Sequence, residues 1–322
     1  MILVDNPSRD PSWNLALEER LFQRAGLTGR GHAMLWRNGP SVIVGRFQNA
    51  FEELDPQAAQ AAGVKVVRRS TGGGAVYHDL GNLNYTLAVP HDNVERIDFK
   101  TLAVPVVEIL RELGVPAELS GRNDLTVSGL KFSGTAQMVS QNSLLYHGTL
   151  MYDVDLTRLS TILRVAPEKY LSKGAKSIRS RVTNLKEWLP PDIDLDVIES
   201  RLAERLGPEK VQPSEEDMAA AREIQAAKYG NWEWNWGRSP ESTVTMDRRF
   251  PWGWINLRFQ VVDGLVAMAK VYGDFFGGDL GEAEKALLGL PFEGDELTRR
   301  VGDLANAIDG ASPGDLIGLL RE

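Results

Sequence analysis

The pattern of hydrophobic and polar positions predicts amphipathic helices separated by short strands along most of the chain. Apolar residues recur at helical spacing over residues 12–25, and Ser12 stands where an N-cap is expected. Comparable spacing predicts helices over residues 52–62 and 101–114, and Gly114 marks the end of the second of these. Each helix is flanked by segments that have a different, strand-like pattern.

Runs of β-prone residues fill those segments and predict strands. Late in the chain, two such runs alternate around Asp263-Gly264, a dipeptide that strongly favours a hairpin turn, and short helices follow. The long region before the hairpin is therefore predicted to mix helices and strands. The predicted strands cover residues 34–36, 41–45, 64–67, 75–77, 85–89, 125–127, 130–132, 149–152, 254–262 and 265–272.

A change in composition predicts where the chain divides. Residues 237–243 read Gly-Arg-Ser-Pro-Glu-Ser-Thr, which is typical of a linker. With 322 residues, 43% of them hydrophobic, the chain is long enough for one large domain and one small one. The expected domains are residues 1–238 and residues 239–322.

Charge and hydropathy argue against two classes of partner. The formal net charge of −8 disfavours a general nucleic-acid-binding protein, whose affinity would come from a basic surface that neutralises phosphates. No run approaches the roughly 18 apolar residues that cross a membrane, and the first residues lack the pattern of a signal peptide. We therefore expect a cytoplasmic protein with neither nucleic acid nor a membrane as its partner.

Missing residue types and motifs exclude several chemistries. The chain has no cysteine, which rules out a disulfide, a cysteine-based zinc site, an iron–sulfur cluster and a thioester-forming nucleophile. The four histidines are scattered and include no His-Glu-x-x-His pattern, so a metal centre built by the protein alone is not expected. The signatures of Walker-type ATPases, dinucleotide enzymes and serine hydrolases are also missing.

Residues 68–84 hold the most informative motif. Three successive glycines, Gly72 to Gly74, follow Arg68-Arg69 at the end of a predicted strand. Glycine adopts positive φ and lets a ligand approach the backbone, so the free N–H groups of such a turn suit a phosphate or a carboxylate. Two consecutive hairpin turns beside a surface arginine pair would give the same pattern, and the glycines alone do not separate these interpretations.

A second segment, residues 121–137, is predicted to form two short strands around a turn. Because neighbouring residues of a strand point to opposite faces, Lys131 should project away from the apolar residues at 130 and 132. A lysine that faces solvent would do the same. With Asn123 and Asp124 nearby, Lys131 could instead act as a point charge on the phosphate or carboxylate oxygens of a ligand.

Taken together, these segments resemble the lipoate-protein ligase family in its two-domain, ATP-dependent bacterial form. The resemblance includes the accessory C-terminal domain of that form and covers nearly the whole chain. Its central motifs are long and stand in the expected order. The matching stretches are residues 36–38, 44–49, 68–82, 121–136, 147–150, 173–174, 177–185, 232–235 and 272–275.

The resemblance implies an α+β fold, with a large mixed-sheet catalytic domain similar to class II synthetases and biotin ligases and a small α+β accessory domain. It implies a two-step reaction in one site, in which lipoate and Mg²⁺-ATP form lipoyl-AMP and release pyrophosphate. The ε-amine of a lysine on an acceptor domain then attacks the mixed anhydride and forms an amide. The implied acceptors are lipoyl domains of 2-oxoacid dehydrogenase complexes or glycine-cleavage H-like proteins.

The resemblance also implies roles for individual residues. Lys131 would bridge the lipoyl carbonyl oxygen and the α-phosphate, and would offset negative charge in both transition states. Asp124 would lie near phosphate and Mg²⁺, and residues 173–182 would form a loop that closes over the adenylate. The residues expected to bind ATP or lipoate are Arg69, Ser70, Gly72, Gly73, Gly74, Ala75, Val76, Tyr77, His78, Asn123, Asp124, Lys131, Ala136 and His147.

Other interpretations remain to be compared with this one. His78 and His147 could also be structural histidines, and the apolar lining for a dithiolane tail has only Leu15, Trp36 and Val44 as candidates. A cysteine-dependent transferase of the same fold is excluded by composition, and a biotin ligase by the lack of a Gly-Arg-Gly-Arg-type loop. The remaining alternative is a catalytically inactive lipoyl-domain or nucleotide-binding module of the same fold.

Overall fold

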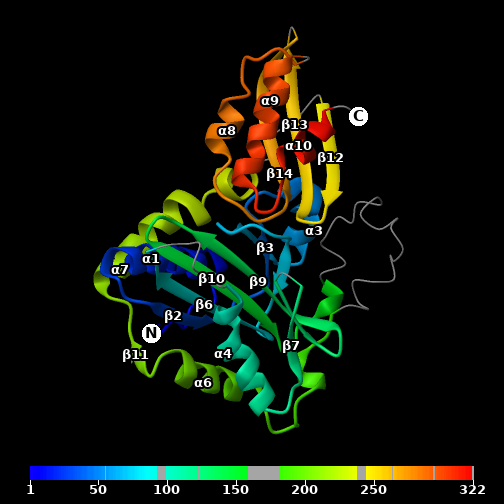
Figure 1. Ribbon diagram of the computed structural model, residues 1–322. Helices are drawn as coiled ribbons and strands as arrows, with labels where there is room; N and C mark the ends of the chain where they lie inside the picture. The colour runs from blue at the N-terminus through cyan, green and yellow to red at the C-terminus, as the bar shows by residue number, and fades with distance from the viewer. Residues whose placement is uncertain are drawn as a thin grey trace.

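The computed structural model describes residues 1–54, 56–92, 99–121, 123–158, 182–237, 244–262, 264–292 and 294–320. Within this part of the chain, a large sheet with helices on both faces carries a separate small sheet with its own helices at one end (Figure 1). The predicted α+β class, with a large mixed sheet and a small accessory unit, is confirmed. Nearly all of the predicted linker lies outside the described residues, so a boundary at residue 238 stays a prediction.

The large sheet contains eight strands. Strand β1 runs parallel to both of its neighbours, β11 and β2, whereas all the other pairs are antiparallel. The strand order is β11 (Glu209–Val211), β1 (Ile2–Val4), β2 (His32–Trp36), β6 (Asn82–Pro90), β10 (Ser143–Met151), β9 (Leu130–Val139), β8 (Asp124–Val127) and β7 (Ala117–Ser120).

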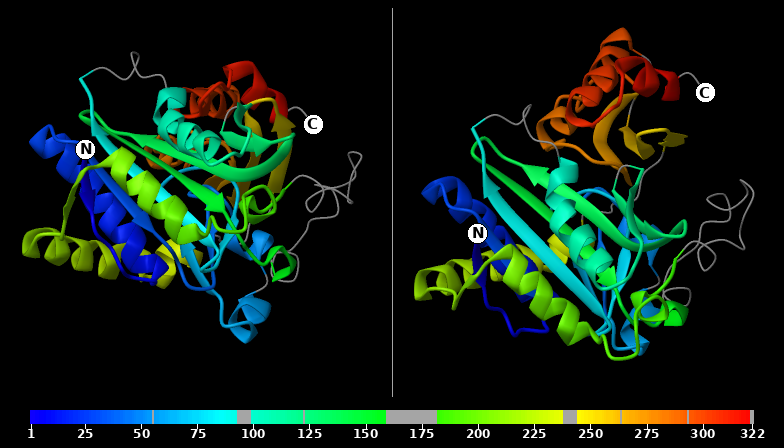
Figure 2. Two further views of the ribbon diagram at one scale, coloured as in Figure 1. Left: turned by 90° about the horizontal axis from the view of Figure 1, so that it is seen from below. Right: turned by 60° about the horizontal axis from the view of Figure 1, so that its bottom comes forward.

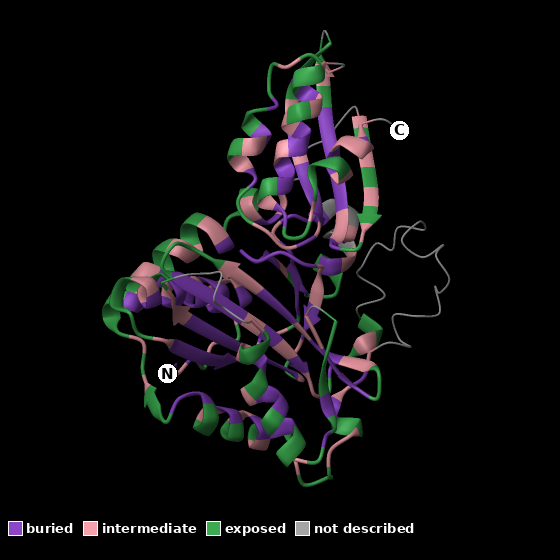
Figure 3. Cartoon of the chain, in the orientation of Figure 1, coloured by how far each residue is buried: buried purple, intermediate pink, exposed green. Residues whose placement is uncertain are grey.

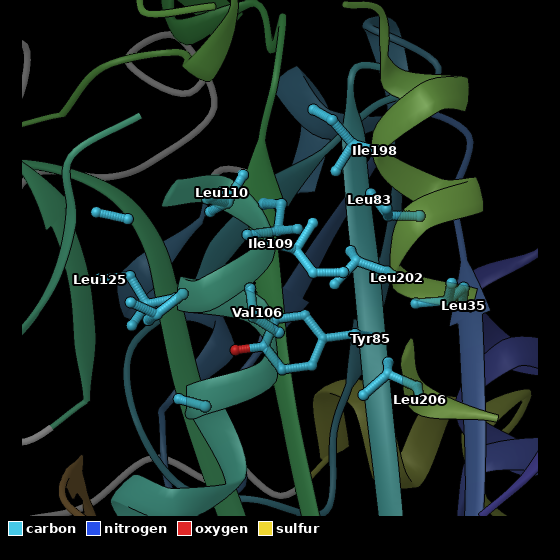
Figure 4. Close-up of a cluster of buried hydrophobic side chains, with 14 of the residues drawn as sticks. Leu35, Leu83, Tyr85, Val106, Ile109, Leu110, Leu125, Ile198, Leu202 and Leu206 are labelled. Atoms are coloured by element: carbon cyan, nitrogen blue, oxygen red, sulfur yellow. The ribbon is translucent and has the colours of Figure 1, made fainter. Parts of the chain in front are cut away.

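The alternation of side chains along these strands gives the sheet two buried faces. On one face, helices α4 (Phe99–Glu112) and α6 (Leu195–Leu206) pack against the main hydrophobic core (Figure 2). Leu35 of β2 and Tyr85 of β6 point toward these helices (Figure 4). Their strand neighbours Trp36 and Asn84 therefore lie on the opposite face, where the cavity described below is found.

That opposite face is covered by α1 (Pro11–Thr28), with α7 (Glu215–Ile224) beside it. The predicted N-cap at Ser12 is wrong, because the helix begins at Pro11 and its cap is Asp10, whose side chain accepts the Ser12 N–H over 3.0 Å. Proline suits the first helical position because no intrahelical bond is lost there. The helix is capped at its C-terminal end by Gly29, which has a φ of 66°.

A second, three-stranded sheet lies next to α1 and carries the glycine run. Its order is β4 (Lys65–Arg68), β3 (Ser41–Val44) and β5 (Val76–His78). The single helix predicted over residues 52–62 is wrong, since the chain forms two short helices, α2 (Ala50–Glu53) and α3 (Pro56–Ala61). A proline has no N–H to continue a helix, so Pro56 starts a new one instead. The short helices η3 (Leu185–Glu187), η4 (Gln225–Tyr229) and η5 (Glu233–Gly237) complete the larger part.

The small part has its own core. Its sheet consists of β12 (Val244–Phe250), β13 (Gly253–Val262) and β14 (Leu265–Asp274), and the hairpin predicted around residues 263–264 is confirmed. Helices α8 (Gly281–Lys285), α9 (Asp295–Asp303), η6 (Leu304–Ala307) and α10 (Pro313–Leu319) complete it, and the buried faces of β13 and β14 turn toward its core (Figure 3). None of the helices formed by the described residues combines the length and the apolar character that a membrane crossing requires.

A β-bulge in β9 brings Lys131 and Gly134 to the same face of the sheet. The pairing register between β8 and β9 shifts at this point and skips Phe132. Lys131 and Gly134 are an odd number of residues apart and would face opposite ways in a regular strand, but the extra residue places them on the same face. Phe132 itself is fully buried in the main core.

We expect the Phe132→Ala variant to lose about 3–5 kcal/mol of unfolding free energy, the usual cost of removing a fully buried aromatic ring. Equilibrium denaturant unfolding of the larger part measures this loss. Val139→Ala, at an exposed position of the same strand, is the matched control and should change stability far less. A loss below about 1 kcal/mol for Phe132→Ala would contradict the described packing.

Candidate functional site

A cavity of about 650 Å³ lies between the large sheet and the small part of the molecule. This volume is typical of sites for small ligands and cofactors. Its walls come from the glycine run, from α1, from the outer face of the large sheet and from the β12–β13 turn. The predicted site residues that line it are Arg69, Gly73, Gly74, Ala75, Val76, His78, Asn123, Asp124, Lys131, Ala136 and His147.

The floor of the cavity is a row of residues that crosses the large sheet. Trp36 of β2 pairs with Asn84 of β6, and Asn84 pairs with Thr149 of β10. The Thr149 hydroxyl accepts the backbone N–H of Gly134 over 3.2 Å, and Gly134 pairs with Asp124 of β8. Because neighbouring strands lie about 4.8 Å apart, this floor is roughly 19 Å long, with an indole at one end and a carboxylate at the other.

Three predicted site residues, Ser70, Gly72 and Tyr77, do not line the cavity. Tyr77 lies between Val76 and His78 on β5, so strand alternation turns its ring into a separate buried cluster. The Ser70 hydroxyl bonds to the Glu19 carboxylate over 2.9 Å, behind the glycine run. The backbone of Gly72 is packed against the small part of the molecule.

The apolar end of the cavity is formed by Leu15, Trp36 and Ile43. Two of the three candidates for this lining therefore lie in the cavity, but the third, Val44, does not. Val44 follows Ile43 on β3 and points to the other side of that strand, into the cluster that contains Tyr77. Sequence alone did not establish which face of β3 would be turned to the cavity.

Arg69 holds the glycine run in shape from within. Its guanidinium donates to the carbonyl oxygens of Ile43, Gly72 and Gly74 over 3.1, 2.6 and 2.9 Å. Burial lowers the pKa of Arg69 to about 10, opposed by the charges of Asp274 and Glu18, so the group is cationic at neutral pH. Four of its five N–H groups are bonded within the protein, counting the bond from Nε to the Thr71 hydroxyl. One N–H group of Arg69 is therefore left for the predicted contact with ligand oxygens.

The small part of the molecule reaches the same glycine run through main-chain groups. The Gly73 N–H donates to the Phe275 carbonyl oxygen over 3.2 Å, so this amide is not free for a ligand as the sequence suggested. The Gly273 N–H donates to the Phe47 carbonyl oxygen over 2.6 Å, and the rings of Phe47 and Phe275 stack at 4.7 Å. A Cβ on Gly72 would lie 2.1 Å from the Phe275 oxygen, which explains why residue 72 has no side chain.

At the polar end, the Lys131 ammonium lies 2.6 Å from the Asp124 carboxylate. Both side chains are about one-third exposed, at 35% and 36%, so a ligand can reach the pair. The Asn123 side-chain amide donates to the Thr135 carbonyl oxygen over 3.3 Å. The prediction that Lys131 projects away from its apolar neighbours is confirmed for Phe132, which is in the core while Lys131 lines the cavity.

His147 is held by a buried carboxylate. Its Nδ1 lies 2.9 Å from the carboxylate of Glu18, a residue of α1 that is only 2% exposed. The same Glu18 oxygen accepts the Thr86 hydroxyl over 2.6 Å, and that hydroxyl accepts the Trp36 indole N–H over 2.9 Å. Because a carboxylate only accepts, Nδ1 of His147 carries a proton, and the Trp36 ring is fixed by the same network.

Sequence reasoning missed the residues that the small part contributes. Arg249, Trp252, Asp274 and Phe276 all line the cavity, although they follow the glycine run by more than 170 positions in the chain. The guanidinium of Arg249 is exposed and makes no ion pair with any other residue of the described part. Apart from Asp274, which lies in the family-matching stretch of residues 272–275, no local pattern marks these residues, because the docking of the two parts brings them to the cavity.

Two predicted features are not visible in this arrangement. Residues 173–181 of the predicted closing loop lie outside the described residues, and Val182 forms a parallel bridge with Lys131. Among the described residues, no group of three or more His, Asp or Glu side chains is arranged to hold a metal ion. A metal ion here would need ligand atoms beyond the His, Asp and Glu side chains of the described residues.

Comparisons with known proteins place this geometry in context. The family model described as lipoyl protein ligase A/B catalytic domain matches residues 10–207, and the one described as bacterial lipoate protein ligase C-terminus matches residues 239–320. The lipoate-protein ligase LplJ of Bacillus subtilis is 39% identical over 302 residues, which cover 91% of each chain. Lipoate–protein ligase 1 of Staphylococcus aureus is 37% identical over 89% of each chain.

Solved structures agree with these relatives. A bi-partite lipoate protein ligase from Thermoplasma acidophilum, described together with its E2 lipoyl domain, is 32% identical, with a TM-score of 0.66 over 76% of this chain and 98% of its own. The crystal structure of P. falciparum LipL1 in complex with lipoate shares the fold, with a TM-score of 0.82 over 100% of this chain and 99% of its own, at 22% identity.

We expect Gly72→Ala to weaken the docking of the small part, because the added Cβ would be driven into the Phe275 carbonyl. Overpacking of this kind costs about 1–3 kcal/mol, so the Gly73 amide should exchange its hydrogen roughly ten- to a hundredfold faster. Hydrogen exchange of the peptide that contains Gly73 measures this.

Gly74→Ala is the matched control, since its Cβ would only touch the Asp274 carboxylate at 3.6 Å. Unchanged exchange in Gly72→Ala would show that the contact between Gly73 and Phe275 is not maintained in solution.

Proposed function

Since the chain belongs to the lipoyl protein ligase A/B family and is a lipoate-protein ligase, we propose that its cavity binds lipoate and ATP, joins them as lipoyl-AMP and transfers the acyl group to a lysine. The observation that carries this assignment is that one cavity joins an apolar end at Trp36 to a charged end at Lys131 and Asp124. Lipoate has the same polarity, with an apolar dithiolane tail and a carboxylate head. The head would therefore lie at the charged end.

Lys131 acts on the reacting groups at that end. A free carboxylate is a poor acyl donor, so it must first attack the α-phosphate, which builds up negative charge between the two. The Lys131 ammonium, already oriented by Asp124 over 2.6 Å, offsets this charge on the acyl oxygen and the α-phosphate. The same contact stabilises the oxyanion that forms when the acceptor amine attacks the anhydride. Its role is electrostatic in both steps.

The glycine run holds the nucleotide. Gly74, Ala75 and Val76 line the cavity, and Arg69 keeps the run rigid by bonding the carbonyl oxygens on either side of Gly73. Because these donors and acceptors are fixed before ATP arrives, little ordering is needed on binding. Main-chain contacts from this run would recognise the adenine and the ribose phosphate.

Asp124 and Asn123 fit a magnesium ion that arrives with the nucleotide. Mg²⁺ is commonly bound through one or two carboxylates together with substrate phosphates, rather than by a full protein cage. One carboxylate and one amide at the charged end of the cavity match that donor set. The ion would neutralise phosphate charge there, and Asp124 would also keep Lys131 oriented.

Arg249 supplies a further positive charge for the formation of lipoyl-AMP. ATP brings several negative charges into a cavity where Lys131 is paired with Asp124 and Arg69 is largely occupied by carbonyl oxygens. Arg249 lies on the same cavity wall, and its guanidinium forms no ion pair within the part of the chain that the structure describes. It is therefore assigned to the β- and γ-phosphates, which leave as pyrophosphate and take no part in the transfer step.

The acceptors are assigned to the class of lipoyl domains, such as those of 2-oxoacid dehydrogenase complexes, or to H-like proteins of glycine cleavage. Support comes from the Thermoplasma acidophilum ligase, which is described together with its E2 lipoyl domain. We place the reaction in the cytoplasm, where ATP is available. Residues 173–182 are assigned to the closing loop on the resemblance alone.

Lys131→Ala should lower lipoyl-AMP formation and acyl transfer by more than a hundredfold each, because a lost contact to a transition-state charge costs about 3–4 kcal/mol. Pyrophosphate release measures the first step, and mass measurement of an acceptor lipoyl domain given supplied lipoyl-AMP measures the second. Lys65→Ala, which removes an exposed lysine from β4, is the control. Near-normal rates in Lys131→Ala would remove this lysine from the mechanism, and no pyrophosphate from the unmodified protein would indicate an inactive module.

Arg249→Ala should reduce pyrophosphate release at limiting ATP by roughly ten- to a hundredfold, the range for a lost charged hydrogen bond of about 1.5–3 kcal/mol. Transfer from supplied lipoyl-AMP should stay within about twofold, because that substrate has no β- or γ-phosphate. Arg299→Ala, an exposed arginine of α9, is the matched control. Equal losses in both steps would contradict the assignment to the leaving phosphates.

A further inference from the structure

A line of buried amide side chains connects the N-terminal segment to His78 on the cavity wall. The Asn6 amide nitrogen donates to Asn14 Oδ1 over 2.9 Å, and the Asn6 oxygen accepts the Ser8 backbone N–H over 3.3 Å. The Asn14 nitrogen donates to Asn38 Oδ1 over 2.8 Å. The Asn38 nitrogen lies 3.0 Å from His78 Nδ1. None of the three asparagines lines the cavity, so any effect that they have on a ligand passes through His78.

Backbone groups fix the direction of this line. The Asn14 Nδ2 atom lies 3.2 Å from the carbonyl oxygens of both Ser8 and Arg37, which can only accept hydrogen bonds. This end of the Asn14 side chain must therefore be its NH₂ group. Asn38 then turns its oxygen toward Asn14 and its NH₂ group toward His78, so Nδ1 of that histidine is an acceptor. A neutral imidazole whose Nδ1 accepts carries its proton on Nε2.

The Nε2–H group of His78 has no acceptor among the described residues. The ring is 3% exposed, it lines the cavity, and its Nε2 atom is buried without a hydrogen-bond partner from that part of the chain. Burial, together with the positive charge of Arg69 and the neighbouring His147, lowers the pKa of His78 to about 3, so the ring is neutral. A buried donor left unpaired costs free energy, and the acceptor is therefore expected on the ligand.

The position of His78 indicates which part of the ligand that acceptor belongs to. Its ring lies edge-on to Trp36, with 6.4 Å between the ring centroids, at the apolar end of the floor. Lys131 and Asp124 mark the opposite end, three and four strand spacings from Trp36. With the carboxyl head at Lys131, the acyl tail extends toward His78, and the atoms of a lipoyl tail that can accept a hydrogen bond are the two dithiolane sulfurs.

We propose that Asn6, Asn14 and Asn38 are positioning residues that hold His78 as the Nε2–H tautomer, and that this N–H group donates to a dithiolane sulfur and favours lipoate over sulfur-free acids of equal length. The sulfur assignment rests on the proposed function, whereas the tautomer rests on the amide geometry alone. A straight-chain acid such as octanoate would bury the same donor without a partner. For this reason, a site that binds its substrate through a buried hydrogen bond discriminates against analogues that lack the bonding group.

The tautomer can be read directly in the unmodified protein. In a long-range ¹H–¹⁵N correlation spectrum, His78 should show an unprotonated Nδ1 and a protonated Nε2, and His78→Gln identifies its signals among the four histidines. Added lipoate should shift the Nε2 resonance, whereas added octanoate should leave it near its free position. A protonated Nδ1 would overturn the amide relay, and equal shifts with both acids would overturn the sulfur assignment.

Asn38→Asp tests the relay with a side chain of the same shape. A carboxylate accepts from Nδ1–H, so it should reverse the tautomer and leave Nε2 without a proton to donate. The ratio of kcat/KM for lipoate to that for octanoate, measured by pyrophosphate release, should then fall roughly five- to tenfold, mainly through lipoate.

Asn256→Asp makes the same chemical change at a buried site of the small part, where Arg258 donates to the amide oxygen over 2.7 Å, and should leave the ratio unchanged. An unchanged ratio in Asn38→Asp, or equal losses with both acids, would overturn the proposal. If the unmodified protein released pyrophosphate with neither acid, the proposed function would fail while the spectrum still decided the tautomer.

Discussion

The buried guanidinium of Arg69 is the contact on which the rest of the site depends. Three successive glycines cost chain entropy when they are ordered, and they have no side chains with which to hold a shape. Arg69 provides that hold by bonding the carbonyl oxygens of Gly72 and Gly74 and of Ile43 on the neighbouring strand. Through the Thr71 hydroxyl, which lies 3.0 Å from His147 Nε2, the same cation is linked to the large sheet. Removing it would loosen the glycine run and its link to the large sheet together.

Strand alternation is the rule that made much of this site predictable from the sequence. It correctly predicted that Lys131 points away from the core, because this prediction needs only the two neighbouring residues. Applied across β5, it also separates His78 from Tyr77, although the resemblance to the family had grouped the whole run. It does not give the register between strands or the face that is turned to the cavity. One sequence therefore could not predict the bulge at Phe132, nor that Ile43 and not Val44 would line the cavity.

Contacts between distant parts of the chain set the limit of sequence reasoning. Arg249 and Asp274 reach the cavity only because the small part is docked, and the family-matching stretch that contains Asp274 does not by itself place this residue at the cavity. The line of hydrogen-bonded asparagines that leads to His78 could not be predicted from the sequence for a similar reason. Its members come from the segment before α1, from α1 itself and from the connection between β2 and β3. The starts of α1 and α3 were also predicted wrongly, because each helix begins at a proline, Pro11 or Pro56, and not at the first residue of the apolar pattern.

The docking of the two parts through peptide groups has a consequence for how such proteins diverge. Two main-chain hydrogen bonds and one ring stack join the glycine run and the Phe47 segment to the end of β14. Peptide groups are the same in every sequence, so the two hydrogen bonds constrain residue identity only where a side chain must be absent, as at Gly72. The ring stack and the ion pair between Arg46 and Asp279, which also joins the two parts, depend on particular side chains. The main-chain part of the joint can therefore be inherited while the side chains around it change, and correlated substitutions would mark only the ring stack and the ion pair.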